Sequence, residues 1–162
     1  MIIRGIRSIN PRAHHLNVEH CSNMTFENLY LNTPARSSDT DGISARNSSF
    51  VKISNSVIAT GGDCISLDDG STDFDISNIT CGPGRGISIG SSGKYLDPAS
   101  WLPVRDIRVK KILFRDTFSG IHIMTYPKRI ENQVHNVYFE DIVMKNVKNP
   151  IVNDQEYNTK VR

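Results

Sequence analysis

Apolar and polar residues alternate in short segments along the whole chain, and the segments recur at regular intervals. In one series a small residue is followed by an isoleucine and then by a serine or another polar residue. Its isoleucines are Ile43, Ile65, Ile87 and Ile121, separated by 22, 22 and 34 residues. Self-similarity at such a period predicts a repeat protein, in which each repeat is one structural unit. The third interval is twelve residues longer than the others, and residues 94–103 are the expected insertion.

A second series of segments lies between the first. Each member alternates apolar with polar residues and is rich in β-branched side chains, which predicts short strands. The members span residues 23–29, 50–56, 74–79, 107–112 and 137–142. Asn, Asp, Ser and Gly separate them, so turns rather than helices are expected at the joins. Because no window keeps the period of an α-helix, no long helix is predicted.

Short strands of this kind cannot bury their apolar face alone, but they share one core when they stack as coils of a solenoid. We therefore predict an all-β parallel β-helix that forms a single domain over residues 1–162. The isoleucines should form one internal ladder and the second series another, with Asn ladders at the corners. The second ladder comprises Phe26, Ile53, Ile76, Val109 and Phe139. A β-sandwich with irregular loops is the alternative, which the equal 22-residue intervals disfavour.

Composition excludes some classes of partner. The 162 residues suffice for one domain with a core. Lys and Arg number 19 and Asp and Glu 17, with no block of like charge, which argues against nucleic acid and is compatible with an acidic polymer held by a few cations. No apolar run approaches the ~18 residues of a membrane span. Residues 1–5 lack the features of a signal peptide, so none is expected in this chain.

Three cysteines, Cys21, Cys64 and Cys81, leave an odd thiol whichever two are paired. By themselves they fit a cytosolic protein with free thiols as well as a secreted protein with one bridge. Three Asn-x-Ser/Thr triplets favour a secreted origin. They begin at Asn23, Asn47 and Asn78.

Five segments resemble motifs of glycoside hydrolase family 28, the polygalacturonases, in order and spacing between Gly5 and Tyr157. They span residues 39–43, 60–65, 81–91, 120–125 and 149–157. The resemblance implies a right-handed, single-stranded, pectin-lyase-like β-helix that is incomplete at its N-terminal end. It also implies a disulfide between Cys64 and Cys81, a buried Cys21 thiol, a secreted or cell-wall location, and pectin or polygalacturonate as the partner.

The resemblance further implies inverting hydrolysis of α-1,4-galacturonan without a metal or other cofactor. Inversion needs one protonated carboxyl as general acid, and carboxylates ~6.5–9.5 Å away that activate water. The water-activating pair corresponds to Asp41 and Asp63, which are 22 residues apart and are therefore expected to stack one coil apart. The general-acid position is Gly62, which has no titratable group.

Substrate-binding positions are altered as well. Arg85 stands where the family has a His, while His122 and Met124 stand where it has the Arg and Lys that hold the sugar carboxylate. We expect Arg85, His122 and Tyr157 to bind substrate, Arg85 through its bidentate guanidinium. The alternatives are a permissive glycine-rich turn for Arg85, a surface ring for His122 and a core position for Tyr157.

Loss of a general acid typically costs about 10²–10⁴-fold in rate. Weak or absent hydrolysis is therefore expected, and a non-catalytic pectin-binding or structural fragment is the alternative function. Asp39 is interpreted as a solvated turn residue. Asp68 and Asp69 are expected to lie too far away to replace the acid, because a regular strand over 63–69 would span about 20 Å.

Other kinds of site are not supported. The spacing of His14, His15 and His20 matches no zinc pattern, and no motif supplies the carboxylate cluster that a calcium-dependent pectate lyase needs. No helix follows the glycines of residues 82–86, which argues against phosphate binding. Lys128 and Arg129 are interpreted as a solvated loop. An open solenoid end exposes unpaired strands, so end-to-end self-association is expected.

Overall fold

A computed structural model describes residues 1–90, 102–125 and 134–157. The described residues form strands joined by turns and contain no helix. The expected insertion at 94–103 lies almost entirely outside these ranges, and Lys128 and Arg129 lie outside them.

The strands form two sheets, and every pairing within them is parallel. The long sheet contains β1 (Ile2–Arg4), β4 (Ser22–Glu27), β7 (Ser49–Ala59), β9 (Thr72–Cys81), β11 (Val104–Arg115) and β13 (Val134–Lys145), in that order, with β2 (Arg7–Ile9) and β5 (Tyr30–Asn32) extending the first coils. The short sheet contains β3 (Leu16–Glu19), β6 (Ile43–Arg46), β8 (Ile65–Leu67), β10 (Ile87–Gly90), β12 (Ser119–Met124) and β14 (Asn149–Asp154).

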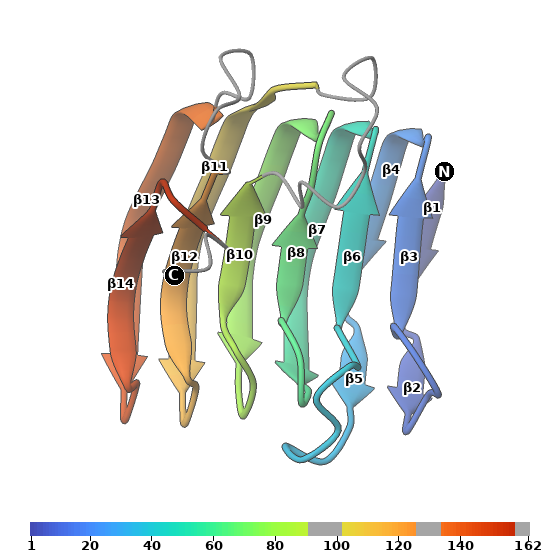
Figure 1. The fold of residues 1–162 in the computed structure, drawn as a ribbon. Coiled ribbons are helices and arrows are strands. Elements are labelled where there is room, and N and C mark those ends of the chain that lie inside the picture. Colours follow the sequence, from blue (N-terminus) through green and yellow to red (C-terminus); the bar gives the residue numbers. More distant parts are fainter. Residues whose placement is uncertain (91–101, 126–133, 158–162) are drawn as a thin grey trace.

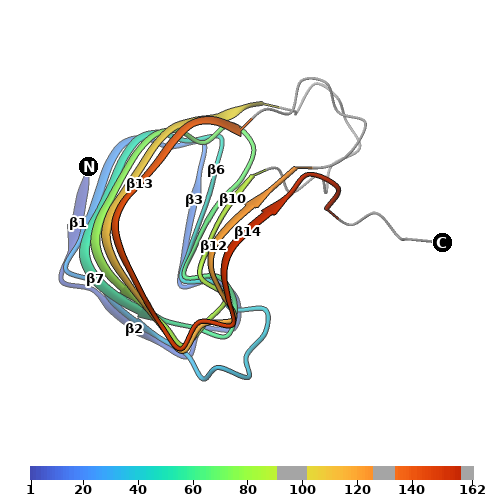
Figure 2. The ribbon, with the colours of Figure 1, turned by 90° about the vertical axis from the view of Figure 1, so that its left-hand side faces the viewer.

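Strand order in both sheets follows chain order, so successive coils stack side by side (Figure 1). Seen along the axis, the coils superimpose as one ring whose two long sides are the two sheets (Figure 2). The predicted right-handed parallel β-helix is therefore confirmed, and the β-sandwich alternative is wrong.

Both predicted ladders are present. The isoleucines pair in register, from Ile43 to Ile65, from Ile65 to Ile87 and from Ile87 to Ile121. Phe26, Ile53, Ile76, Val109 and Phe139 form the second ladder on the long sheet. Phe139, on β13 at the end of this ladder, is only partly buried. Stacking one apolar side chain per coil and per row gives the solenoid a continuous core.

The corners carry the expected polar ladders. Asn28, Asn55 and Asn78 occupy equivalent corner positions, each with a φ between 52° and 56°. Asn tolerates this left-handed conformation better than most residues. The amide of Asn78 donates a hydrogen bond to Oδ1 of Asn55 at 2.7 Å, so these side chains link successive coils.

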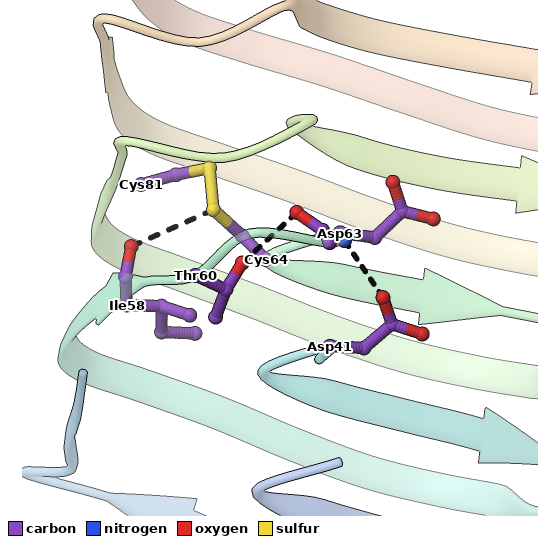
Figure 3. The surroundings of a disulfide bond; sticks show 7 residues. Asp41, Ile58, Thr60, Asp63, Cys64 and Cys81 are labelled. Atoms are coloured by element: carbon purple, nitrogen blue, oxygen red, sulfur yellow. Dashed lines mark hydrogen bonds between the residues drawn. A yellow bond between two sulfur atoms is a disulfide. The ribbon is translucent and has the colours of Figure 1, made fainter. Parts of the chain in front are cut away.

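Cys64 and Cys81 form the disulfide that the resemblance implied, with their Cα atoms 5.9 Å apart. It joins the end of β9 to the turn that precedes β8 (Figure 3). The free Cys21 is only partly buried, which corrects the expectation of a buried thiol. It precedes β4 and packs against the core as a partly buried residue.

Candidate active-site cleft

The outer face of the short sheet is lined by small polar side chains. Ser44, Ser66 and Ser88 pair in register on β6, β8 and β10, and His122 follows them on β12. Side chains alternate across a strand, so the isoleucines on either side of this row point into the core. The serines leave room above the sheet for a groove.

Three charged residues lie beside this row, at the corners that precede the strands. Asp41, Asp63 and Arg85 precede β6, β8 and β10, respectively. Backbone hydrogen bonds hold the corners together: the amide of Gly42 donates to the carbonyl of Asp63, and the amide of Arg85 donates to the carbonyl of Gly62, both at 2.8 Å. The expected one-coil stacking of the two aspartates is therefore observed.

A cleft of about 700 Å³ runs over this face and brings Asp63, Arg85, His122 and Tyr157 together. It is also lined by Ala35, Arg36, Ser38, Gly61, Pro83, Gly84, Ser88, Asp116, Phe118, Ser119 and Met124. An adjoining hollow of about 310 Å³ contains Asp41. Asp63 and Met124 line both spaces, so Asp63 sits where they meet, with Asp41 in the adjoining hollow.

Asp41 is held in place by two partners. Its Oδ1 accepts a hydrogen bond from the backbone N–H of Asp63 at 2.7 Å, and its Oδ2 lies 3.3 Å from Nδ1 of His14 (Figure 3 shows the Asp63 bond). These contacts orient the carboxylate toward the next coil.

Asp41 also occupies space beside Gly62. A Cβ placed on Gly62 would lie 2.2 Å from Oδ1 of Asp41 and 2.8 Å from the carbonyl oxygen of Thr40. Position 62 therefore has no free space for a side chain, since a Cβ there requires the Asp41 carboxylate to move.

Asp63 has the most strongly shifted pKa described for this cleft. Burial and the neighbouring charge of Asp41 raise the pKa of Asp63 to about 7, and Asp68 adds to the rise. A hydrogen bond with Ser88 and the charge of Arg85 act in the opposite direction. A carboxyl with this pKa is present in both protonation states near neutral pH, a common property of functional groups.

His122 and Tyr157 meet at the other side of the cleft. Their ring centroids are 5.9 Å apart, with the planes inclined by 73°, so the contact is edge-to-face. Burial lowers the pKa of His122, and the charge of Asp154 partly opposes this. His122 is therefore a weaker cation at neutral pH than an Arg at this position would be.

Asp68 lines the same hollow as Asp41 and Asp63. The regular strand over 63–69 on which its expected distance rested is not present, since β8 covers only Ile65–Leu67, and the distance itself stays a prediction. Asp69, in contrast, is buried, and Asp39 is exposed and lines neither space.

The cleft includes residues that the sequence patterns did not single out. Arg36 is contributed by the turn between β5 and β6, and Phe118 by the turn before β12. No repeat or motif points to Arg36. Phe118 carries a weak signal, since it is a large apolar residue in a turn that is otherwise polar or small.

The three histidines near the N-terminus have separate surroundings. His14 faces Asp41, His15 is hydrogen-bonded to Ser8 and Thr33, and His20 lies 3.4 Å from the amide of Asn47. Within the described ranges, no three His, Cys, Asp or Glu side chains are grouped so as to hold a metal ion. A search of the same ranges for a helix able to span a membrane found none.

Comparison with known proteins identifies the family. The sequence profile of Glycosyl hydrolases family 28 matches residues 1–162. An exopolygalacturonase from Platanus acerifolia is 41% identical over 96% of this chain and 41% of its own length. A polygalacturonase from Nicotiana tabacum is 41% identical over 96% of this chain and 38% of its own length. The chain thus spans about two fifths of the length of these relatives.

Solved structures agree with the sequence comparison. A polygalacturonase from Erwinia carotovora ssp. carotovora superimposes with a TM-score of 0.87 at 27% identity, covering 98% of this chain and 41% of its own. An endo-xylogalacturonan hydrolase from Aspergillus tubingensis gives 0.88 at 26% identity, over 99% and 44%. In fold and in sequence alike, this chain belongs to glycosyl hydrolase family 28.

Proposed function

We propose that this chain binds galacturonan in the cleft on the short sheet and hydrolyses it slowly or not at all. One observation carries the proposal. The cleft and its adjoining hollow contain two neighbouring carboxylates, Asp63 and Asp41, beside cationic groups, but Gly62 supplies no acid. Relatives named as polygalacturonases support the choice of polymer.

Recognition of an acidic polymer rests on the cations of the cleft. Arg85 and Arg36 line it, and His122 adds positive charge when protonated. A guanidinium pairs with a carboxylate through two parallel hydrogen bonds, which fixes orientation as well as position. Tyr157 offers a ring whose apolar face suits a sugar, so all three expected substrate-binding residues keep that role in the proposal.

Hydrolysis would begin with Asp41 and Asp63 holding a water molecule on one face of the sugar. Accepting the proton of that water requires Asp63 in its ionised form, which its raised pKa makes a minor species in acid. No protonated carboxyl at position 62 assists the leaving oxygen. The reaction would therefore lack the donor half of an inverting mechanism.

Location and domain organisation belong to the same proposal. The Cys64–Cys81 disulfide supports folding in an oxidising compartment, consistent with secretion to a cell wall. The family match over residues 1–162 supports treating this segment as one β-helix domain.

The test measures binding and turnover separately on the 162-residue chain. Saturable binding of polygalacturonate with little release of reducing ends is expected. Rapid release would contradict the assignment of the acid position to Gly62. No binding and no release would leave the structural-fragment alternative. An Asp41→Asn, Asp63→Asn variant serves as control, since any true hydrolysis must fall in it.

A further inference from the structure

Phe118 is a large aromatic side chain that the fold leaves 54% exposed. It lines the 700 Å³ cleft although it belongs to no motif discussed above. Its backbone is firmly held, since its N–H donates to the carbonyl of Gly84 at 2.8 Å and its carbonyl accepts from the N–H of Asn149 at 3.0 Å. An exposed but anchored ring in a cleft is a suitable contact for a ligand.

The backbone ladder places Phe118 along the solenoid axis from the carboxylates. Gly62 accepts a hydrogen bond from Arg85, and Gly84, the residue before Arg85, accepts one from Phe118. Phe118 is therefore two coils from Gly62, about 10 Å at the usual spacing of neighbouring strands. Phe118 would therefore contact a different sugar unit from the one whose glycosidic bond Asp41 and Asp63 would face.

A cation accompanies the ring. The ammonium of Lys148 lies 5.0 Å from the centroid of Phe118, and the backbone N–H of Lys148 donates to the carbonyl of Thr117. Lys148 is exposed. Asp116 also lines this part of the cleft, and its Oδ1 accepts a hydrogen bond from the amide of Asn146 at 2.7 Å. The amide partly satisfies that carboxylate, and Lys148 supplies the cation beside the ring.

A uronic acid presents an apolar C–H face and a carboxylate on the same ring. An aromatic face packs against the first, and an ammonium pairs with the second. We propose that Phe118 and Lys148 form a subsite for a uronic acid unit of the polymer, distant from the bond that Asp41 and Asp63 face. The identity of the polymer rests on the proposed function. Binding at the subsite does not depend on whether the chain hydrolyses that polymer.

Isothermal titration with galacturonate oligosaccharides tests the subsite, with Phe118→Ala compared against Phe50→Ala. Phe50 is 57% exposed but lies on β7 of the long sheet, away from the cleft. Phe118→Ala is expected to weaken binding by about three- to tenfold, as loss of one aromatic contact does, and Phe50→Ala to leave it unchanged. Equal affinities for the two variants would overturn the subsite.

Lys148→Met supplies a second, independent measurement. It should weaken binding of the acidic oligosaccharide, with a smaller loss at high salt, and should not affect a fully methyl-esterified oligosaccharide. An equal effect on both ligands, or on neither, would contradict the role of Lys148 as a carboxylate partner. If the unmodified chain binds neither ligand, the proposed function and the subsite are both wrong. If it binds but the Phe118 and Lys148 variants bind equally well, only the subsite is wrong.

Discussion

The carboxylate of Asp41 lies where the side chain of residue 62 would begin. Its Oδ1 is 2.2 Å from the position of a Cβ on Gly62, closer than two unbonded atoms can approach. The glycine and the orientation of Asp41 are therefore coupled, because the hydrogen bond from the Asp63 amide holds Asp41 in the space that glycine leaves. Replacing Gly62 therefore changes the position of the Asp41 carboxylate as well as the side chain at residue 62.

Restoring the acid should restore hydrolysis at a cost in stability. A Gly62→Asp, Arg85→His, His122→Arg, Met124→Lys variant is expected to release reducing ends from polygalacturonate about 10²-fold faster than the same variant with Gly62 retained. Displacement of Asp41 should destabilise the fold by about 1–3 kcal/mol, as overpacking does.

Gly62→Ala is the matched control for that experiment. It introduces the Cβ without the acid, so it should lower the melting temperature and leave hydrolysis unchanged. A restored acid that gives no rate increase in a folded protein would argue that position 62 does not donate the proton. An unchanged melting temperature in both variants would argue that Asp41 moves aside freely.

Stability should depend on pH through Asp63. Its pKa of about 7 in the folded state is well above the ordinary value for aspartate, so the folded chain holds this proton more tightly than the unfolded chain. The resulting stabilisation, up to about 4 kcal/mol, is present below pH 4 and is lost as the pH rises through 7. His122 has the opposite effect on the free energy of unfolding. Because its pKa is lowered in the folded state, its contribution to stability is present at a pH above the ordinary pKa of histidine and is lost as the pH falls.

Asp63→Asn isolates this contribution. The difference in unfolding free energy between the variant and the unmodified chain should shift in favour of the variant by a few kcal/mol between pH 5 and pH 8. Chemical denaturation at the two pH values measures it. A pH-independent difference would contradict the raised pKa.

The fold was predictable because the interval between repeats gives the register in which successive strands pair. Ile43, Ile65 and Ile87 recur at 22 residues, and one apolar residue per coil in each row suffices to place the strands. The stacking of Asp41 and Asp63 follows from the same interval. The extent of β8 and the place of Asp68 on the hollow did not follow, because where a strand ends depends on corner geometry that alternation alone does not encode.

Phe118 and Arg36 were not predictable from the repeat. Both are contributed by turns, and which turns border the cleft is decided by how successive coils superimpose in three dimensions. Phe50 illustrates the problem, since it is an exposed phenylalanine of similar accessibility that faces another surface. Composition does not distinguish the two.

Galacturonan binding should strengthen in acid through His122. Because burial lowers its pKa, His122 is mostly neutral at pH 7 and becomes a cation below its ordinary range. Galacturonate carboxylates stay ionised down to about pH 4, close to the pKa of other carboxyl groups. His122→Arg is expected to raise affinity at pH 7 by about three- to tenfold and to reduce the pH dependence measured by titration calorimetry. The pH dependence that remains is assigned to Asp63; an unaltered pH profile would exclude His122 from the binding site.

The disulfide should support both the fold and the cleft. Cys64 follows Asp63 directly, so the Cys64–Cys81 bond anchors the corner that carries this carboxylate (Figure 3). Its 17-residue separation corresponds to about 3 kcal/mol in the loop-entropy treatment of the unfolded chain. A Cys64→Ser, Cys81→Ser variant should lose this much unfolding free energy and bind polygalacturonate more weakly, whereas Cys21→Ser should change neither. Equal stability of the double variant and the unmodified chain would show that stacking of the coils alone holds the corner.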